Sequence, residues 1–183
     1  KLEHPSCGLA CADHLRNVLK NETQDEVAAL IMEPMQGTAG NVIPPNDFVH
    51  AVREIADEFG ALLIADEILT GFGRTGTMWA SEQFGLKPDV MTIGKGMGGG
   101  FPLSGVASSH ELMSAKPFGE ASGSSSSYGG NPLAAAAGLG AVEAIIDEKL
   151  VENSARVGKI MLDALKKLQE KYRFIGDVRG RGL

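Results

Sequence analysis

Asp66 and Lys95 are the two side chains of this sequence whose types and places could do chemistry together. Asp66 closes the apolar run Ala61–Ala65, and Lys95 follows Val90–Ile93 and lies between two glycines. An aspartate at the end of one buried strand and a lysine at the end of the next would lie at one edge of a sheet. A pyridine cofactor needs such a pair, because a carboxylate keeps its ring nitrogen protonated and an amine forms a Schiff base.

Both residues also have ordinary interpretations. Asp66 could be a helix cap or a surface acid, and Lys95 could be one more solvated lysine. The buried runs before them, and the glycines on either side of Lys95, favour strand ends with room around the amine. Glu67 follows Asp66, and the side chains of a strand alternate between its faces. We therefore expect one carboxylate to point into the site and the other into the structure.

The segment Gly71–Gly76 matches the pattern G-x-G-x-x-G of a dinucleotide-binding loop. Two carboxylates, Asp66 and Glu67, stand at the preceding strand end, where they would repel a pyrophosphate. Thr77–Ala80 does not clearly begin a helix either, so a glycine-rich active-site loop is the preferred interpretation. Lys95 between its glycines lacks the other residues of a phosphate-binding P-loop.

These residues need an α/β domain to position them. The pattern predicts a largely parallel sheet with helices packed against it, because strand-like and helix-like segments alternate. Asn131 is the expected N-cap of one helix, with Pro132 in its first turn. The expected helices are Ala12–Lys20, Asp47–Phe59, Asn131–Asp147 and Leu150–Tyr172. The expected strands are Val27–Glu33, Ala61–Ala65, Asp89–Ile93 and Leu103–Ser108, with Phe174–Leu183 as a strand entering another unit.

Composition excludes several classes of function. The chain has 183 residues and a net charge of −6, so nothing suggests a nucleic-acid surface. No apolar run approaches the roughly 20 residues that span a bilayer, and no signal-peptide pattern is present, so a cytoplasmic protein without membrane contact is expected. His4, Cys7, Cys11 and His14 have the residue types of zinc ligands, but their spacing fits no common module; no metal is expected.

Taken together, the motifs resemble the class III family of pyridoxal-phosphate-dependent aminotransferases, which has fold type I. The resemblance spans most of the chain, and its ordered motifs are Glu33–Gly37, Asp66–Gly76, Pro88-Asp89, Gly94–Gly96 with Gly98–Gly100, Tyr128–Ala134 and Val178–Leu183. It implies pyridoxal 5'-phosphate as the cofactor and transfer of an amino group from an amine or amino acid to an oxo acid.

The resemblance also assigns roles to residues. It implies that Lys95 forms the Schiff base and shuttles protons, and that Asp66 pairs with the pyridine nitrogen. Glu33 would support the site from the neighbouring strand end. Ser127 stands where the family usually has a threonine that reaches the cofactor phosphate of the partner subunit, with Tyr128 beside it, so a homodimer with shared active sites is implied.

Two departures from the family pattern bear on the substrate. Leu69 stands where ornithine- and acetylornithine-type members have a glutamine, and Thr38 stands where they have a glutamate that pairs with a switching arginine. Both changes resemble the ω-amino acid/amine:pyruvate branch, although pyruvate and 2-oxoglutarate both stay open as acceptors.

The chain resembles a fragment of such an enzyme. Residues 1–173 would be part of the large cofactor domain, and residues 174–183 the start of the passage into the C-terminal small domain. The segments that bring the stacking aromatic and the carboxylate-binding arginine are not in the sequence, so we expect the isolated chain to be inactive. An aminomutase, racemase or decarboxylase of the same family and an inactive remnant of the fold are the alternatives.

Overall fold

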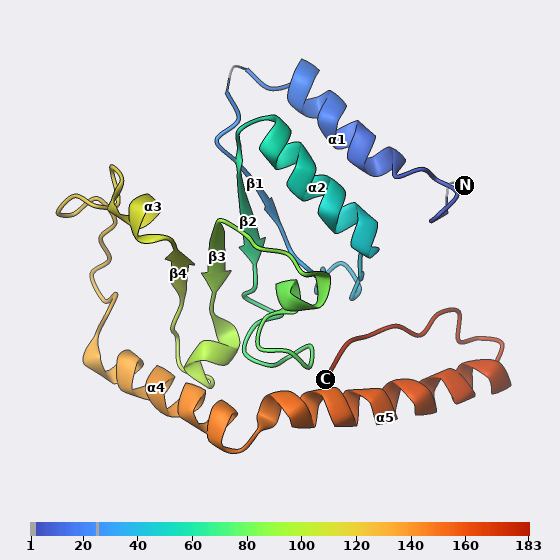
Figure 1. Cartoon of the computed structure of the whole chain (residues 1–183). Coiled ribbons are helices and arrows are strands. Elements are labelled where there is room, and N and C mark those ends of the chain that lie inside the picture. Colours follow the sequence, from blue (N-terminus) through green and yellow to red (C-terminus); the bar gives the residue numbers. More distant parts are fainter. Residues whose placement is uncertain (1–2, 25) are drawn as a thin grey trace.

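A four-stranded sheet forms the centre of the protein in a computed structural model, which describes residues 3–24 and 26–183. Its strands are β1 (Ala29–Met32), β2 (Leu62–Asp66), β3 (Val90–Ile93) and β4 (Gly105–Ser108), side by side in that order. The first three are parallel and β4 is antiparallel to β3, as the arrowheads in Figure 1 show. The prediction of an α/β fold with a mainly parallel sheet is confirmed. Three residues of the predicted domain 1–173, Lys1, Leu2 and Asp25, lie outside the described residues.

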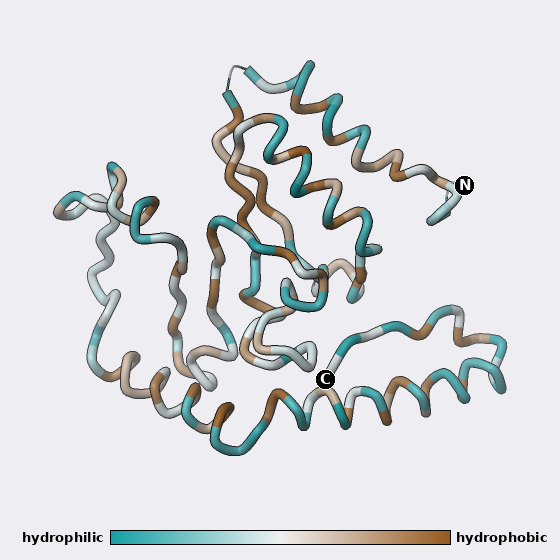
Figure 2. The backbone as a smooth tube through the Cα atoms, in the orientation of Figure 1, coloured by the Kyte–Doolittle hydropathy of each residue, from teal (hydrophilic) through white to brown (hydrophobic). Residues whose placement is uncertain are grey.

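Helices cover one face of this sheet. The helices α1 (Ala10–Asn21) and α2 (Asn46–Glu58) lie together on one side of β1 and β2 (Figure 1). Val49 and Val52 of α2 pack on Leu63, and Leu30 joins the same cluster. Figure 2 shows the strands as the apolar centre of the chain. Burial of such side chains is the main favourable term that holds the layers together.

The opposite face of the sheet is open. Side chains alternate along a strand, so Ile31 of β1 points away from the helices, and its side chain is 63% exposed. The register pairs Asp66 with Thr92 and Thr92 with Val106, which places these three residues in one row on the open face. Val106 is 53% exposed. Asp66 therefore belongs to the uncovered face of the sheet.

A short helix follows each of the strands β2, β3 and β4. The chain after β2 forms a turn-rich loop and the 3-10 helix η1 (Ala80–Phe84), and the chain after β3 enters the 3-10 helix η2 (Lys95–Gly98) at once. After β4 comes the short helix α3 (His110–Ser114). The glycine motif Gly71–Gly76 therefore opens no α-helix, in agreement with the argument against a dinucleotide loop.

Two long helices, α4 (Pro132–Asp147) and α5 (Leu150–Lys171), run along one end of the sheet (Figure 1). The predicted cap is confirmed, because Asn131 accepts a hydrogen bond from the backbone N–H of Ala134 and Pro132 begins the helix. The buried residues of both helices are small. Large apolar side chains on them are exposed, among them Leu133, Leu139, Ile146 and Ile160.

The predicted strand Phe174–Leu183 is wrong. This segment has no strand structure and runs back along α5 to end near the loop after β2 (Figure 1). The backbone N–H of Leu183 donates to the carbonyl of Arg74 at 3.1 Å, and the Arg181 guanidinium lies 4.6 Å from the centre of the Phe84 ring. A strand needs a neighbouring strand edge to pair with, and this segment lies against a helix and a loop instead.

Asp89 joins three elements at the start of β3. Its carboxylate accepts hydrogen bonds from the backbone N–H of Leu63 and from Arg53 of α2, both at 2.7 Å. Burial raises the pKa of Asp89, but these hydrogen bonds outweigh it, so the net pKa lies below the ordinary value for aspartate. The edge of the sheet remote from Asp66 is thus held by a charged clamp.

No helix in the described ranges 3–24 and 26–183 combines the length and the apolar character that crossing a membrane requires.

Candidate active site

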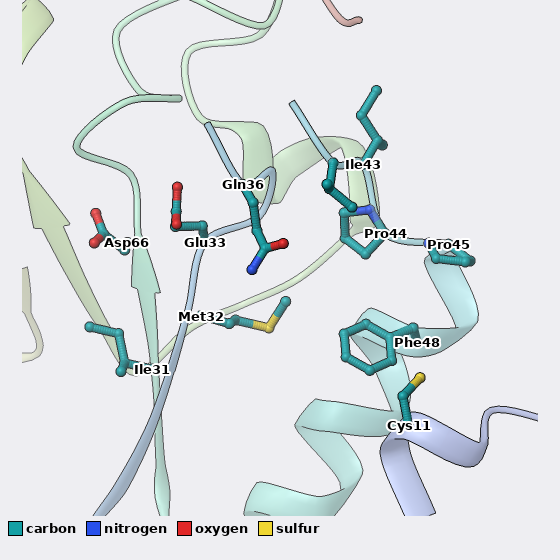
Figure 3. A pocket seen from close by; sticks show the side chains of 11 residues that line it. Cys11, Ile31, Met32, Glu33, Gln36, Ile43, Pro44, Pro45, Phe48 and Asp66 are labelled. Atoms are coloured by element: carbon teal, nitrogen blue, oxygen red, sulfur yellow. The ribbon is translucent and has the colours of Figure 1, made fainter. Parts of the chain in front are cut away.

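Asp66 and Glu33 lie side by side at the carboxyl end of the sheet. Met32 is the register partner of Ala65, so one further residue along each strand brings Glu33 beside Asp66. Both line a cavity of about 600 Å³, and Figure 3 shows their carboxylates on the side of the strand that carries Ile31. Met32 points the other way, toward Phe48 (Figure 3).

Each of these two carboxylates is oriented by one backbone hydrogen bond. The N–H of Gly37 donates to Glu33 Oε2 and the N–H of Ile68 donates to Asp66 Oδ1, both at 3.0 Å. The second oxygen of each carboxylate has no hydrogen-bond partner among the described residues. Both side chains are half-buried, so each presents a free acceptor to the cavity.

Lys95 is the first residue of η2 and has an unusual backbone. Its φ is +42°, which a residue with a Cβ rarely adopts and which is often seen at functional positions. The residue is exposed and lines a second cavity of about 880 Å³. Phe72 and Arg74, from the loop after β2, form one wall of that cavity, and Ala141 and Ala144 of α4 form another.

The structure brings Asp66 and Lys95 to one edge of the sheet but not into one cavity. Asp66 pairs with Thr92, and Lys95 follows three residues later on the neighbouring strand. Asp66 lines the cavity of Glu33, and Lys95 lines the cavity of Phe72 and Arg74. The loop after β2 connects the two cavities along the chain, because it begins directly after Asp66 and contributes Phe72 and Arg74 to the cavity of Lys95.

Glu67 has the opposite orientation to Asp66. Its side chain is fully buried and accepts hydrogen bonds from the backbone N–H groups of Ala80 at 3.1 Å and Ser81 at 2.7 Å. It also accepts one from the hydroxyl of Thr70. The two carboxylates therefore have opposite orientations, with Asp66 at the cavity and Glu67 in the interior, as the alternation along a strand predicts.

Ser127 and Tyr128 lie outside both cavities. They belong to an exposed loop before α4, and the Tyr128 side chain is 84% exposed. The Tyr128 carbonyl accepts a hydrogen bond from the side chain of Asn131 at 2.8 Å. The structure of the single chain therefore does not bring these two residues to Asp66 or Lys95.

Sequence reasoning missed two parts of this edge. Thr92 stands beside Asp66, and its hydroxyl is buried with no hydrogen-bond partner among the described residues. Its place one residue before the end of the expected strand Asp89–Ile93 was the available signal. Phe72 and Arg74 were read only as parts of a glycine motif, and nothing in the sequence indicates that they face Lys95.

No group of three or more histidine, cysteine or acidic residues gathers as a metal site in the part of the chain that the structure describes. His4 instead lies 2.8 Å from the carboxylate of Asp47, and this hydrogen bond lowers the pKa of Asp47. Cys7 and Cys11 are free thiols.

Comparison with known proteins gives one consistent family. The family model described as aminotransferase class-III matches residues 3–183. A leucine/methionine racemase of Thermococcus litoralis is 42% identical over 99% of this chain and 40% of its own length. A 5-aminovalerate aminotransferase of Pseudomonas aeruginosa is 44% identical over 92% of this chain and 39% of its own length. The chain thus spans about two fifths of the relatives that it matches.

Solved structures agree in fold. A transaminase from the marine bacterium Virgibacillus superposes with a TM-score of 0.87 at 38% identity, covering 95% of this chain and 40% of that one. The ornithine δ-aminotransferase of Plasmodium falciparum gives a TM-score of 0.82 at 36% identity, covering 94% of this chain and 44% of that one.

Proposed function

The chain belongs to the class III aminotransferase family, and on that premise we propose that it carries the lysine and the aspartate of a pyridoxal 5'-phosphate-dependent aminotransferase. The observation that supports this most strongly is the pairing of β2 with β3. It puts an aspartate and, three residues past its partner, a lysine at the same edge of one sheet. Ligands of open α/β sheets bind at that edge.

The groups at this edge fit the proposed cofactor. Asp66 offers a free carboxylate oxygen for a protonated ring nitrogen. Glu33 offers a second free carboxylate oxygen beside it in the same cavity. Lys95 forms no ion pair with any described residue, so its amine is available for a covalent bond. A carboxylate for the ring nitrogen and an amine for the Schiff base are the two groups that the chemistry of such a cofactor needs.

When bound, pyridoxal phosphate supplies a ring that accepts the electrons released at the substrate carbon. Asp66 would hold a proton on the ring nitrogen, which increases the capacity of the ring to accept electrons. Lys95 would bind the cofactor through Nζ, and once displaced by the substrate amine it would take the proton from the substrate carbon as a general base. Glu33 would support the ring from the side of β1.

A homodimer completes this proposal. Ser127 and Tyr128 lie on an exposed loop, away from Asp66 and Lys95 of their own chain. We infer that they serve the cofactor phosphate of the partner subunit, for which the Ser127 hydroxyl is a suitable donor. A cytoplasmic location stays a prediction from the sequence.

For the substrate we propose an ω-amino acid or an amine as donor and pyruvate as acceptor. Thr38 and Leu69 lack the glutamate and the glutamine of ornithine-type members, so the groups that recognise 2-oxoglutarate and the cofactor's phenolic oxygen are absent at these positions. The Leu69 side chain lies against Gly37, where even a Cβ would not fit.

The racemases among the relatives favour a second candidate. A racemase returns the proton to the other face of the same carbon, and it needs no oxo acid. The residues of this chain would serve both reactions, since both begin with loss of the same proton to a base.

A half-reaction screen of the complete protein tests the proposal. An ω-amino acid or amine donor should be consumed, with pyruvate preferred over 2-oxoglutarate in the return reaction. Strong preference for 2-oxoglutarate would contradict the proposed acceptor. Inversion of an amino acid without any acceptor would favour the racemase.

The 183-residue chain should not turn over substrate alone, even with cofactor added. We propose that residues 1–173 are part of the large domain and that residues 174–183 lead toward the C-terminal domain. Measurable turnover by the isolated chain would contradict this assignment.

A further inference from the structure

Glu67 is the buried carboxylate that the proposed chemistry leaves without a task. It has no exposed surface, and no arginine, lysine or histidine among the described residues forms an ion pair with it. A buried charge is costly unless hydrogen bonds compensate for it. Those hydrogen bonds come from the hydroxyl of Thr70 and the backbone N–H groups of Ala80 and Ser81, which start η1.

These contacts close the loop after β2 at both ends. The backbone N–H of Gly71 donates to the Glu67 carbonyl at 2.8 Å, while the carboxylate holds the far end at Ala80. A Cβ at Gly71 would lie 2.8 Å from the Glu67 carbonyl oxygen and 2.8 Å from the Trp79 ring. The loop is thus folded tightly onto one residue.

The closed loop forms a wall of the Lys95 cavity. Phe72 and Trp79 pack edge to face, with ring centres 4.9 Å apart. Phe72 also lies against Gly96, next to Lys95, since a Cβ at Gly96 would come within 3.2 Å of the Phe72 Cβ. Glu67 directly follows Asp66, the last residue of β2. The backbone N–H of Glu67 donates to the Thr92 carbonyl of β3 at 3.0 Å, which anchors this strand end.

We propose that Glu67 is a positioning residue that sets the Lys95 cavity relative to Asp66. This inference rests on the proposed function, because the two half-sites matter together only if one cofactor bridges them. Glu67 touches neither cavity. It acts by holding the loop that carries Phe72 and by anchoring the strand end that carries Asp66.

The test compares Glu67→Gln with Glu82→Gln in the complete protein. A glutamine at position 67 replaces one acceptor oxygen by an NH₂ donor, so a buried N–H of Ala80 or Ser81 loses its partner. Glu82 is the matched control, because it accepts from the Trp79 N–H of the same loop at 2.7 Å but is exposed and has no bond to the strand.

Two readouts separate the outcomes. In the cofactor-free protein, Glu67→Gln should speed amide hydrogen exchange at Ala80 and Ser81 by about tenfold or more. With cofactor, it should weaken pyridoxal phosphate affinity by about tenfold and shift the pH midpoint of the visible absorbance band. Glu82→Gln should change exchange only near Trp79. Thr70→Val removes one of the donors to Glu67, so it should change both readouts in the same direction by a smaller amount. This variant replaces Glu67→Gln in the test if Glu67→Gln does not fold.

If Glu67→Gln exchanges faster but keeps the wild-type cofactor affinity and pH midpoint, the positioning role is overturned. An equal loss of cofactor affinity in Glu82→Gln would overturn it as well. A wild-type protein that takes up no cofactor would instead overturn the proposed function. The exchange data are measured without cofactor, so they still report whether Glu67 holds the loop.

Discussion

The region from β1 to β3 and the region from α3 to α5 are built in opposite ways. In the first, large apolar side chains such as Val49, Ile55 and Leu63 have no exposed surface. In the second, the buried positions of α4 and α5 are Ala134, Gly138, Ser154 and Gly158, while their large apolar side chains are exposed. The same contrast holds for buried charge, since Glu67 and its donors belong to the first region.

The contrast indicates which contacts each region depends on. The first region buries many of its large apolar side chains within this chain, and its own backbone N–H groups orient Asp66 and Glu33. The second region touches the first through small residues and leaves its apolar side chains uncovered. Apolar surface of this kind marks an interaction site. Lys95 stands where the two regions meet, with Phe72 on one side and Ala141 on the other.

The largest effect should come from Lys95, at the junction. We expect Lys95→Ala in the complete protein to lower kcat/KM by about 10⁴-fold or more, because both the covalent link and the base are lost. Steady-state kinetics measure this. Lys87→Ala, an exposed lysine ahead of β3, is the control and should retain activity.

The second-largest effect on activity should come from Asp66, which lies in the region from β1 to β3. Asp66→Asn keeps the size of the side chain but removes the charge, so we expect kcat to fall by about 10²- to 10³-fold, the loss typical of one electrostatic stabiliser. The fold should be unaffected, since the Ile68 N–H can still donate to the amide oxygen. An Asp66→Asn variant with wild-type kcat would remove Asp66 from the chemistry.

Alanine substitutions at two glycines of α4 and α5 should change the unfolding free energy in opposite directions. A Cβ at Gly158 of α5 would lie 2.0 Å from the backbone oxygen of Gly182, so Gly158→Ala should cost about 1–3 kcal/mol of unfolding free energy. A Cβ at Gly140 of α4 meets nothing within 4 Å, and Gly140→Ala should stabilise by up to about 1 kcal/mol. Denaturant unfolding measures both, and equal effects would contradict the close approach of residues 180–183 to α5.

The smallest effect concerns acid stability. The pKa of Asp89 is lowered in the folded protein, so its contribution to stability is present above about pH 4 and is lost as the pH falls through the folded pKa. We expect Asp89→Asn to remove about 1 kcal/mol at neutral pH and to flatten the acid limb of the stability curve. Asp163→Asn on α5 should have less effect, because its bond to Lys159 is exposed and screened.

An Asp89→Asn variant with the wild-type acid limb would show that the clamp does not couple to folding. An equal change in Asp163→Asn would remove the distinction between the two regions.

Local signals in the sequence predict most of the elements. Apolar runs ended by polar residues or glycine mark β2 and β3, and Asn131 with Pro132 marks the start of α4, because caps and breakers act within a few residues. Phe174–Leu183 shows the limit. Its apolar residues Phe174, Ile175 and Val178 suggest a strand, but three glycines weaken that signal, and a strand also requires a free neighbouring edge, which is a property of the whole fold.

The positions of Asp66 and Lys95 in the fold were predictable from the sequence, and their surroundings were not. Strand ends locate Asp66 and Lys95 at one edge of the sheet. The left-handed backbone of Lys95, and the cavity that this residue lines together with Ala141 and Ala144 of α4, are not indicated by its neighbours in the sequence. The donors of Glu67 at positions 80 and 81 are 13 and 14 residues away along the chain, and no local pattern indicates them.

The most direct test of the central claim, that Lys95 binds the cofactor beside Asp66, is covalent trapping. The complete protein is incubated with pyridoxal 5'-phosphate, reduced with borohydride, digested and mapped by mass spectrometry. The account predicts one phosphopyridoxyl group per chain, on Lys95, and weaker labelling in Asp66→Asn. A label on another lysine, or none on Lys95, would contradict it.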